Sequence, residues 1–426
     1  MMVVKWQINR ERMLRDLDNL RQFGKTEDQG VSRHPFTPED HLARQYLIQE
    51  AKKFGFSVRL DPVSTVIARY VGKDENAPAI LLGSHYDSVI NGGAFDGILG
   101  VVTALEVLRV LSENNIRLQH PVEMIAFNDE EGSRFGKGFA CSKAMTGRLT
   151  LEDAETSFDK NGISLAEAMQ RSGFEPKDIP LAKRHSTELH AFVELHIEQG
   201  PVLDAHQEDI GIVTTIVGTC RYQITIFGRP DHAGTTPMTM RKDPLVAAAK
   251  VIAKIPELAR LYDPQGVGTV GQISTKPGAA NVVPASTTFS LDVRSKIPGA
   301  ARNAVQRILQ ELETVCGTEL KFEAKNLKSL QQETPVEMHP QVQQAIESSV
   351  QQFGIPYRYM FSGAGHDAEL IAELCPTGMI FVPSVEGRSH SPFEYTKPEH
   401  IEIGARVMMQ TVLNLDSMDL GATQNR

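Results

Sequence analysis

The segment that decides the fold is residues 79–97, AILLGSHYDSVINGGAFDG, in which an apolar run ends at His85 and a glycine-rich turn follows. Short apolar runs bounded by turn residues are typical of buried strands. Comparable runs occupy residues 122–128 and 192–196, and a helical pattern, VVTALEVLRVLSE, occupies residues 101–113. This alternation predicts an α/β fold with a mostly parallel, helix-covered sheet.

A different pattern begins near residue 213. Residues 222–228, YQITIFG, and residues 287–295, TTFSLDVRS, alternate apolar and polar side chains like half-exposed strands. Two long helices are also predicted, one starting at Asp243-Pro244 and one over residues 299–316 that stops at Gly317. Strands that bury one face against two helices indicate a smaller α+β domain.

The first pattern returns near residue 332, with a helix over residues 340–353 and the strand-like MIFVPS. We therefore expect a discontinuous catalytic domain, residues 1–212 and 332–426, and an inserted domain, residues 213–331.

The charge and cysteine content narrow the function classes. The chain has 53 acidic and 44 basic residues, intermixed, and a net charge of -9, which argues against a nucleic-acid or anionic-membrane partner. No segment approaches the roughly 18 apolar residues of a membrane-spanning helix. The N-terminus lacks the core of a signal peptide, and the four cysteines show no CxxC spacing. These features predict a cytoplasmic protein with small-molecule chemistry.

Side chains that bind metals occur in the glycine-punctuated segments of the chain, most of which follow the predicted strands. In an open α/β sheet, ligands collect at the carboxyl ends of the strands, so residues distant in sequence can meet there. A single histidine after a strand, or an aspartate in a glycine-rich turn, usually has a structural role. The combination favours a paired-metal hydrolase whose ligands are His85, Asp96, Glu131, His196 and His390.

Two ions about 3.5 to 4 Å apart need one ligand that bridges them, and a carboxylate can do so. We expect Asp96 to bridge, because little side-chain bulk crowds the ions in its GGAFDG turn. His85 and His196 would complete one site, and Glu131 and His390 the other. Imidazole and carboxylate ligands suit zinc, manganese, cobalt or nickel.

Two further carboxylates have expected roles beside these ligands. Asp87 lies two residues after His85 and is expected to hold the imidazole of His85 so that the correct ring nitrogen faces the metal. Glu130 precedes the ligand Glu131, and in an extended segment the two side chains would point to opposite sides. Glu130 would then face the substrate as the general base and later the acid. The alternative is that the pair belongs to a solvated acidic loop.

Taken together, the motifs resemble the M20 metallopeptidase-like family, in particular its hydantoinase/carbamoylase branch. That branch contains N-carbamoyl-L-amino-acid hydrolases, allantoate amidohydrolases and yeast-type β-ureidopropionases. The resemblance covers nearly the whole chain. The motifs that carry it are GSHYDSVINGGAFDG, NDEEGSRFG, HIEQGPVL, GRPDHAGTTPM, NVVPASTTFSLDVRS, SGAGHDA and FVPSVEGRSHSPFEYT. Relatives often have Gly-Asn where this chain has Ser64-Thr65.

The resemblance implies a dinuclear catalytic domain and an inserted lid domain that closes over the substrate and forms a homodimer. It implies the same five metal ligands and Glu130 as the base. It also implies that substrate is contacted by Gln199, His232, Asn281 and Arg294. Arg294 can bind a carboxylate with two hydrogen bonds, and His232 can donate to the oxyanion of the transition state. His366-Asp367 is expected to shape the pocket through backbone groups.

The expected reaction is hydrolysis of N-carbamoyl-L-amino acids to amino acid, carbon dioxide and ammonia. RFGKGFACSKAMTGRL, residues 134–149, is more similar to carbamoylases than to other members of the branch. Hydrolysis of allantoate, another carboxylate with a ureido group, is the alternative. An aminoacylase or dipeptidase is disfavoured because these relatives typically have an acidic ligand in place of His196. A non-catalytic binding protein is disfavoured because Glu130 and every expected ligand are present.

Overall fold

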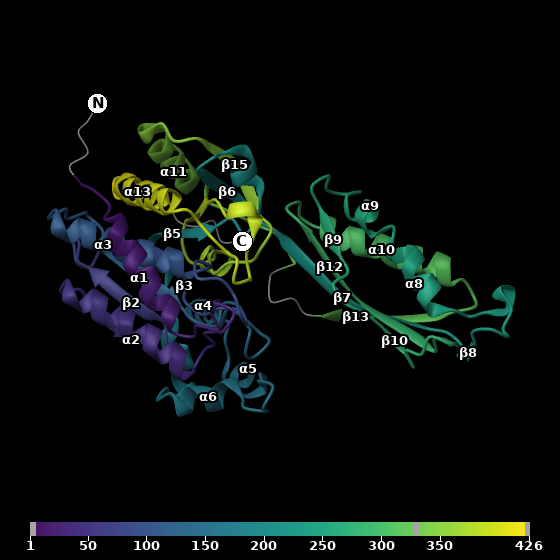
Figure 1. Ribbon diagram of the computed structural model, residues 1–426. Helices are drawn as coiled ribbons and strands as arrows, with labels where there is room; N and C mark the ends of the chain where they lie inside the picture. Colours follow the sequence, from purple (N-terminus) through teal and green to yellow (C-terminus); the bar gives the residue numbers. More distant parts are fainter. Residues whose placement is uncertain (1–5, 328–332, 422–426) are drawn as a thin grey trace. The chain divides into compact units, whose positions relative to one another are not determined.

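The computed structural model describes residues 6–327 and 333–421, and the chain divides into two compact units (Figure 1). The first unit comprises Met1–Thr214 and Glu337–Arg426, and the second comprises Thr215–Val336. The predicted boundary after residue 212 lies next to this division. The predicted boundary after residue 331 lies outside the described residues.

The first unit is built on a nine-stranded sheet. Its four central strands, β4, β3, β5 and β16, are parallel, and the strands on either side of them, β2 and β6, run antiparallel. The predicted α/β class with a mostly parallel central sheet is confirmed. The order is β1 (Ser57–Leu60), β2 (Val66–Tyr70), β4 (Val122–Phe127), β3 (Ala79–His85), β5 (Leu189–Ile197), β16 (Thr377–Val382), β6 (Ile210–Ile216) and β14 (Val336–Glu337), with β15 (Tyr357–Ser362) paired to β6.

Helices cover this sheet and bury its central strands. Every residue of β3, β4 and β16 is buried, as expected for parallel strands that are covered on both faces. One group of long helices packs together along the sheet (Figure 1): α1 (Arg10–Gln22), α3 (Ile98–Glu113), α11 (Pro340–Phe353) and α13 (Pro398–Leu415). The other elements are α2 (Pro38–Lys53), α4 (Ala140–Thr146), α5 (Leu151–Thr156), α6 (Leu165–Arg171), α7 (Val202–His206), α12 (Ala368–Ile371) and the 3-10 turns Pro176–Ala182, Ser186–Glu188 and Val385–Gly387.

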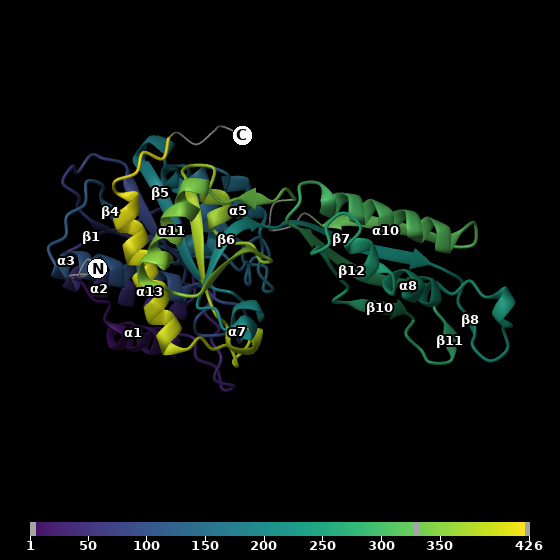
Figure 2. The ribbon, with the colours of Figure 1, turned by 90° about the horizontal axis from the view of Figure 1, so that it is seen from above.

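The second unit is a five-stranded sheet packed against helices (Figure 2). Residues of β12 alternate between buried and partly exposed, which matches the predicted half-exposed strand. The sheet order is β10 (Ile273–Lys276), β12 (Ser286–Ser295), β7 (Gly218–Phe227) and β13 (Lys321–Leu327), with β9 (Val267–Thr269) paired to β12. The helices are α8 (Pro244–Ile252), α9 (Ile255–Ala259) and α10 (Ala300–Cys316); β8 (Asp231–His232) pairs with β11 (Val282–Val283), and a 3-10 turn spans Met238–Met240.

The helix ends of the second unit show which start and stop signals in the sequence were read correctly. Asp243 caps α8 by accepting hydrogen bonds from the next backbone N–H groups, and Gly317 ends α10 with a φ of 51°. The prediction of one long helix after Asp243 is wrong, because α8 ends at Ile252 and a separate α9 follows. Pro256 lies in the first turn of α9, where it cannot continue a preceding helix, since proline has no N–H to donate.

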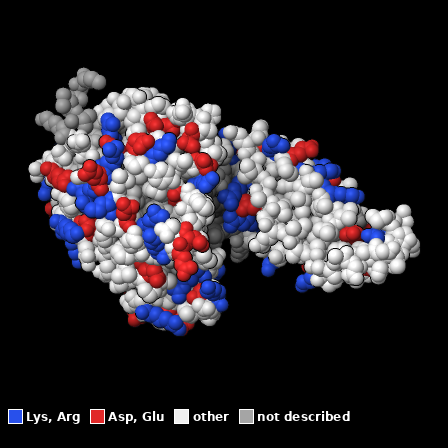
Figure 3. Space-filling model, viewed as in Figure 1, with Lys and Arg blue, Asp and Glu red and all other residues white. Residues whose placement is uncertain are grey.

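The surface charge and the hydropathy of the helices are relevant to whether the protein binds nucleic acids or membranes. Figure 3 shows Lys and Arg interspersed with Asp and Glu over the visible face of the first unit. Among the described residues, no helix combines the length and apolar character needed to cross a membrane.

Candidate metal centre and active site

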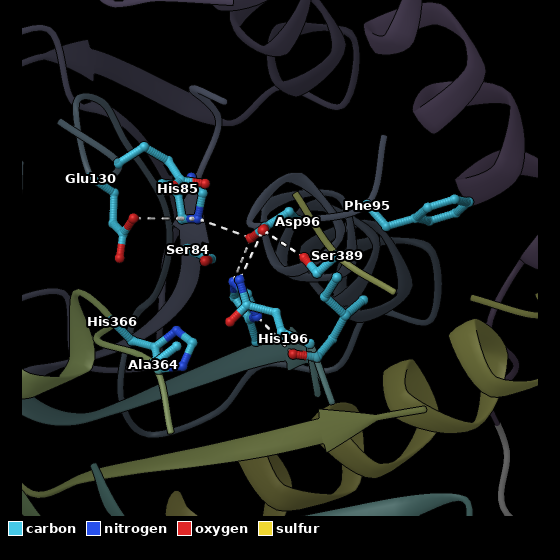
Figure 4. Close-up of polar contacts among 12 residues, drawn as sticks. Ser84, His85, Phe95, Asp96, Glu130, His196, Ala364, His366 and Ser389 are labelled. Carbon is cyan, nitrogen blue, oxygen red and sulfur yellow. Dashed lines mark hydrogen bonds and ion pairs between the residues drawn. The ribbon is translucent and has the colours of Figure 1, made fainter. Parts of the chain in front are cut away.

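The predicted ligands meet at the carboxyl edge of the parallel strands. His85 ends β3, Glu131 follows β4, His196 lies near the end of β5, and His390 follows β16. Asp96, in the turn before α3, lies among them (Figure 4). The structure therefore brings all five candidate ligands together, in two groups that share Asp96.

The two oxygens of Asp96 face different partners. Oδ1 lies 3.1 Å from Nε2 of His196 and 3.5 Å from Nε2 of His85. Oδ2 lies 3.1 Å from Nε2 of His390, and that nitrogen lies 3.4 Å from Oε1 of Glu131. A carboxylate with one oxygen toward each group has the arrangement that a bridging ligand requires.

Unpaired polar atoms show that these residues fit metal ions. Asp96 Oδ1 and His196 Nε2 are buried, and neither makes a hydrogen bond of acceptable geometry. A buried polar atom without a partner is costly, and each such atom needs an explanation. Nitrogen and oxygen donors converging on one point are the ligands that borderline divalent cations prefer.

The ring orientations of two histidines also fit this role. Nδ1 of His196 lies 2.8 Å from the carbonyl oxygen of Ile197, and Nδ1 of His85 lies 3.2 Å from that of Asp87. Because a carbonyl can only accept, each Nδ1 carries a proton, so in the neutral ring each Nε2 presents its lone pair toward Asp96.

Asp87 does more than the sequence predicted. Its Oδ1 lies 3.5 Å from Nδ1 of His85, but its carboxylate also accepts backbone hydrogen bonds from Glu130 at 3.1 Å and Glu131 at 3.2 Å. Asp87 therefore connects the β3 edge to the segment that carries the candidate base and one candidate ligand.

The prediction that Glu130 and Glu131 point to opposite sides of an extended segment is wrong. The chain turns at Asp129, which has a φ of 58°, and no strand continues through residues 128–131. As a result both carboxylates approach His85; Oε2 of Glu130 lies 3.8 Å from its Nε2. Burial, followed by the repulsion of Glu131, raises the pKa of Glu130 well above its usual value, although His85 opposes the shift.

The cluster has an excess of negative charge. Burial and the nearby charge of Asp96 raise the pKa of Glu131 to about 7. The contact with Asp96 raises the pKa of His390 to about 9, against the effect of burial. Burial disfavours ionisation of Asp96, but contacts with the three histidines hold its pKa well below the usual range. Carboxylates crowded in this way are stabilised by cations.

The glycines of the Asp96 turn make room for side chains. A Cβ on Gly97, which has a φ of 66°, would lie 2.5 Å from Cδ2 of His85 and closer still to its Nε2. A Cβ on Gly93 would lie 2.5 Å from Cβ of Glu394 and closer still to its carboxylate. The space beside Gly97 is taken by the ring of His85, and the space beside Gly93 is taken by Glu394.

The chain is similar to known proteins over nearly its whole length. Residues 81–414 match the model of the peptidase family M20/M25/M40. The chain belongs to this family. The M20 chain is 40% identical over 412 residues to the N-carbamoyl-L-amino acid amidohydrolase of Geobacillus stearothermophilus, covering 96% of this chain and 99% of that protein. It is 37% identical over 407 residues to the allantoate amidohydrolase of Bacillus subtilis, covering 93% and 95%.

A solved structure agrees. The M20 chain superimposes with a TM-score of 0.90 on an amidase of the hydantoinase/carbamoylase family from Burkholderia multivorans, with 35% identity and coverage of 97% and 99%. The predicted resemblance to this branch is confirmed. The M20 chain is an amidohydrolase that acts on C–N amide bonds.

Three side chains around the M20 centre were not assigned from sequence. Ser389 contacts the carboxylate of Asp96, and Glu394 contacts the backbone of the Asp96 turn. His366 was expected to act through its backbone, but its buried ring packs against that of His196 with centroids 4.5 Å apart. Nε2 of His366 lies 2.8 Å from Oγ of Ser362. The position of Ser389 and Glu394 on either side of His390 in FVPSVEGRSHSPFEYT was the available signal.

The candidate substrate residues fall in different places. In the first unit, Nε2 of Gln199 donates to Oδ2 of Asp96 at 2.8 Å. In the second unit, His232 on β8 pairs with Val282 on β11, next to Asn281. Arg294 lies near the end of β12 and donates to both oxygens of Asp292, at 2.9 and 3.1 Å. The structure thus brings His232 and Asn281 together and places Arg294 elsewhere.

The departure at Ser64-Thr65 has a structural explanation. Ser64 is buried with a φ of 77°, a conformation that favours glycine. Its Oγ accepts a hydrogen bond of 3.0 Å from Nδ2 of Asn128, which immediately follows β4. The serine therefore adds a contact to the strand end that leads to Glu130.

Proposed function

We propose that this M20 amidohydrolase cleaves the carbamoyl C–N bond of N-carbamoyl-L-amino acids and releases the amino acid, carbon dioxide and ammonia. The observation that carries the proposal is the position of Asp96, with one oxygen toward His85 and His196 and the other toward His390. The substrate class is supported by the relatives, because the Geobacillus stearothermophilus protein is named for N-carbamoyl-L-amino acids.

The proposed cofactor is a pair of divalent ions, zinc, manganese, cobalt or nickel. His85 and His196 would hold one, Glu131 and His390 the other, and Asp96 both. When bound, such ions lower the pKa of water and offset the negative charge that develops on the substrate oxygen. The carboxylates of Asp96, Glu130 and Glu131 lie close together. Among the described residues, none of the three forms an ion pair with a lysine or an arginine.

Glu130 is the proposed proton carrier. Its carboxylate is buried, and its raised pKa favours uptake of a proton from water near neutral pH. The water oxygen adds to the carbamoyl carbon, and Glu130 then gives the proton to the departing nitrogen. Asp87 holds Glu130 in place through the backbone hydrogen bond described above.

Residues of the second unit are proposed to bind the substrate. Nδ1 of His232 accepts a hydrogen bond of 3.0 Å from the backbone N–H of Gly234, so in the neutral ring the proton lies on Nε2. That N–H can donate to the oxyanion. Arg294 is proposed to bind the substrate carboxylate, which must compete with Asp292 for the guanidinium.

The second unit also supports a homodimer. Arg294 lies at the ninth position of β12. The strands β8, which contains His232, and β11, which follows Asn281, lie beyond the opposite end of β12 (Figure 2). At about 3.3 Å per residue, the separation along the strand is on the order of 25 Å. A small substrate cannot span this distance. If His232 and Arg294 bind one substrate molecule, they come from two subunits.

Complementation tests this arrangement. Arg294→Ala and His232→Ala variants would each lose most activity, and we expect mixed dimers to regain roughly a quarter of wild-type activity, because half the dimers are mixed and each restores one site. Unmixed variants incubated separately are the control. Mixing without recovery, while the subunits demonstrably exchange, would place both residues in one subunit.

Allantoate is the second candidate substrate. It also presents a carboxylate and a ureido C–N bond, and the Bacillus subtilis relative is named for it. We further propose a cytoplasmic location, which is supported by four free, buried cysteine thiols.

A substrate screen tests the function. Metal-reconstituted protein should release ammonia from N-carbamoyl-L-amino acids faster than from allantoate, and should leave N-acetyl amino acids intact. Glu130→Gln should retain the metals and lose a factor of roughly 100 to 10,000 in turnover. Preference for allantoate would establish the alternative, and a fully active Glu130→Gln variant would remove this residue from its role.

A further inference from the structure

Glu394 is a buried carboxylate outside the ligand set, 5% exposed, and it reaches the turn that carries Asp96. Its Oε1 accepts the backbone N–H groups of Phe95 at 2.9 Å and of Asp96 at 3.0 Å. These contacts join parts of the chain that lie 299 and 298 residues apart. Glu394 therefore holds the backbone from which the candidate bridging carboxylate projects.

Ser389 extends this contact to the carboxylate itself. Its Oγ lies 2.8 Å from Oε2 of Glu394. It also lies 3.1 Å from Oδ2 of Asp96 (Figure 4). Ser389 immediately precedes the candidate ligand His390. The segment that contains residues 389–394 thus contacts Asp96 at its backbone, at its carboxylate and through His390.

Gly93 shows that the chain accommodates Glu394 closely. Any side chain at this position would overlap the glutamate, so the turn can hold the carboxylate only if residue 93 is glycine. Burying a carboxylate is costly unless its oxygens are satisfied. Here two backbone N–H groups and one hydroxyl satisfy them, and all three belong to the Asp96 turn or to the residue before His390.

We propose that Glu394 is a positioning residue, which together with Ser389 fixes Asp96 in the orientation that directs one oxygen to each metal site. The inference rests on the proposed metal centre and names a residue outside its ligand set. Glu394 does not touch the ions or the substrate. Its effect is on how well the preformed ligands match the metal geometry.

The test is metal titration of apo-protein by calorimetry, with zinc as the probe, alongside the thermal midpoint of each apo variant. Glu394→Ala removes both acceptor oxygens, and we expect metal affinity to fall roughly 10- to 100-fold, the usual effect of removing a partner that orients ligands. Glu394→Gln should recover much of this loss, because its amide oxygen still accepts both N–H groups and its amide nitrogen can donate to Ser389. Glu399→Ala, at an exposed glutamate in the first turn of the following helix α13, is the matched control.

Three results would overturn the proposal: Glu394→Ala with wild-type affinity, Glu399→Ala with an equal loss, or a fall in thermal stability without any fall in affinity. If Glu394→Ala does not fold, Ser389→Ala decides. It leaves the backbone contacts of Glu394 intact and removes the hydroxyl that contacts Oε2 of Glu394 and Oδ2 of Asp96, so unchanged affinity would contradict the proposal. A wild-type protein that binds no zinc would instead overturn the proposed metal centre.

Discussion

Replacing Gly97 by alanine separates backbone strain from damage to the metal centre. The new Cβ would lie 2.5 Å from Cδ2 of His85, whereas real Cβ contacts are essentially never shorter than 3.0 Å. The buried ring must therefore recede by at least about half an ångström, against a tolerance of about 0.2 Å in metal–ligand distances. In addition, Gly97 combines a φ of 66° with a ψ of −54°, outside the left-handed helical region, so alanine there has a backbone penalty of at least about 1–2 kcal/mol.

Gly55→Ala is the matched control. Gly55 has a φ of 74°, and a Cβ there would meet nothing within 4 Å, so this variant has the backbone penalty without the contact. Urea unfolding of the apo-proteins should show a loss of about 1–2 kcal/mol for Gly55→Ala and a larger loss for Gly97→Ala, which must also displace the buried His85 ring. Metal analysis after dialysis should show full occupancy for Gly55→Ala and depletion for Gly97→Ala. Full occupancy with wild-type affinity in Gly97→Ala would refute the assignment of His85 as a ligand.

Three further predictions concern other parts of the chain. His196→Ala should lower metal content and turnover together, with partial recovery in excess metal, and tight binding at full occupancy would contradict its assignment. Arg294→Lys should raise KM for carboxylate substrates with unchanged metal content, because lysine lacks the planar fork; an unchanged KM would exclude this contact. Burial opposes ionisation of Glu123, but Arg184 and Arg69 hold its pKa below the usual value. The ionised carboxylate therefore stabilises the fold fully above the unfolded-state pKa of about 4.3, and this stabilisation is lost as the pH falls through the lower pKa of the folded state. Glu123→Gln should therefore reduce the free energy of unfolding more at pH 7 than at pH 3, and equal losses at both would contradict the shift.

The central strands and the candidate ligands could be predicted because their signals are local. Apolar runs marked β3, β4 and β16, and each candidate ligand lies at or near the end of a strand or in a glycine-rich turn. Parallel pairing then brings these ends together without any knowledge of distances. The glycine that ends α10 was predicted for the same reason, since one residue is enough to stop a helix.

The features that were missed depend on contacts between distant segments. The turn at Asp129 puts Glu130 and Glu131 on the same histidine, and nothing in NDEEGSRFG requires a positive φ at an aspartate. Glu394 lies near His390 in the FVPSVEGRSHSPFEYT motif, but nothing in the motif shows that its side chain is buried. Its role emerges only from backbone N–H groups almost 300 residues away. Likewise, the separation of Arg294 from His232 follows from the strand between them, which a list of motif residues does not reveal.

The central claim is that two metal ions share Asp96. Anomalous diffraction from crystals grown with the reconstituted metal measures this directly. We predict two peaks about 3.5 to 4 Å apart, one beside His85 and His196 and the other beside Glu131 and His390, each next to a different oxygen of Asp96. A single peak at saturating metal, or two peaks of which only one contacts Asp96, would contradict the shared centre.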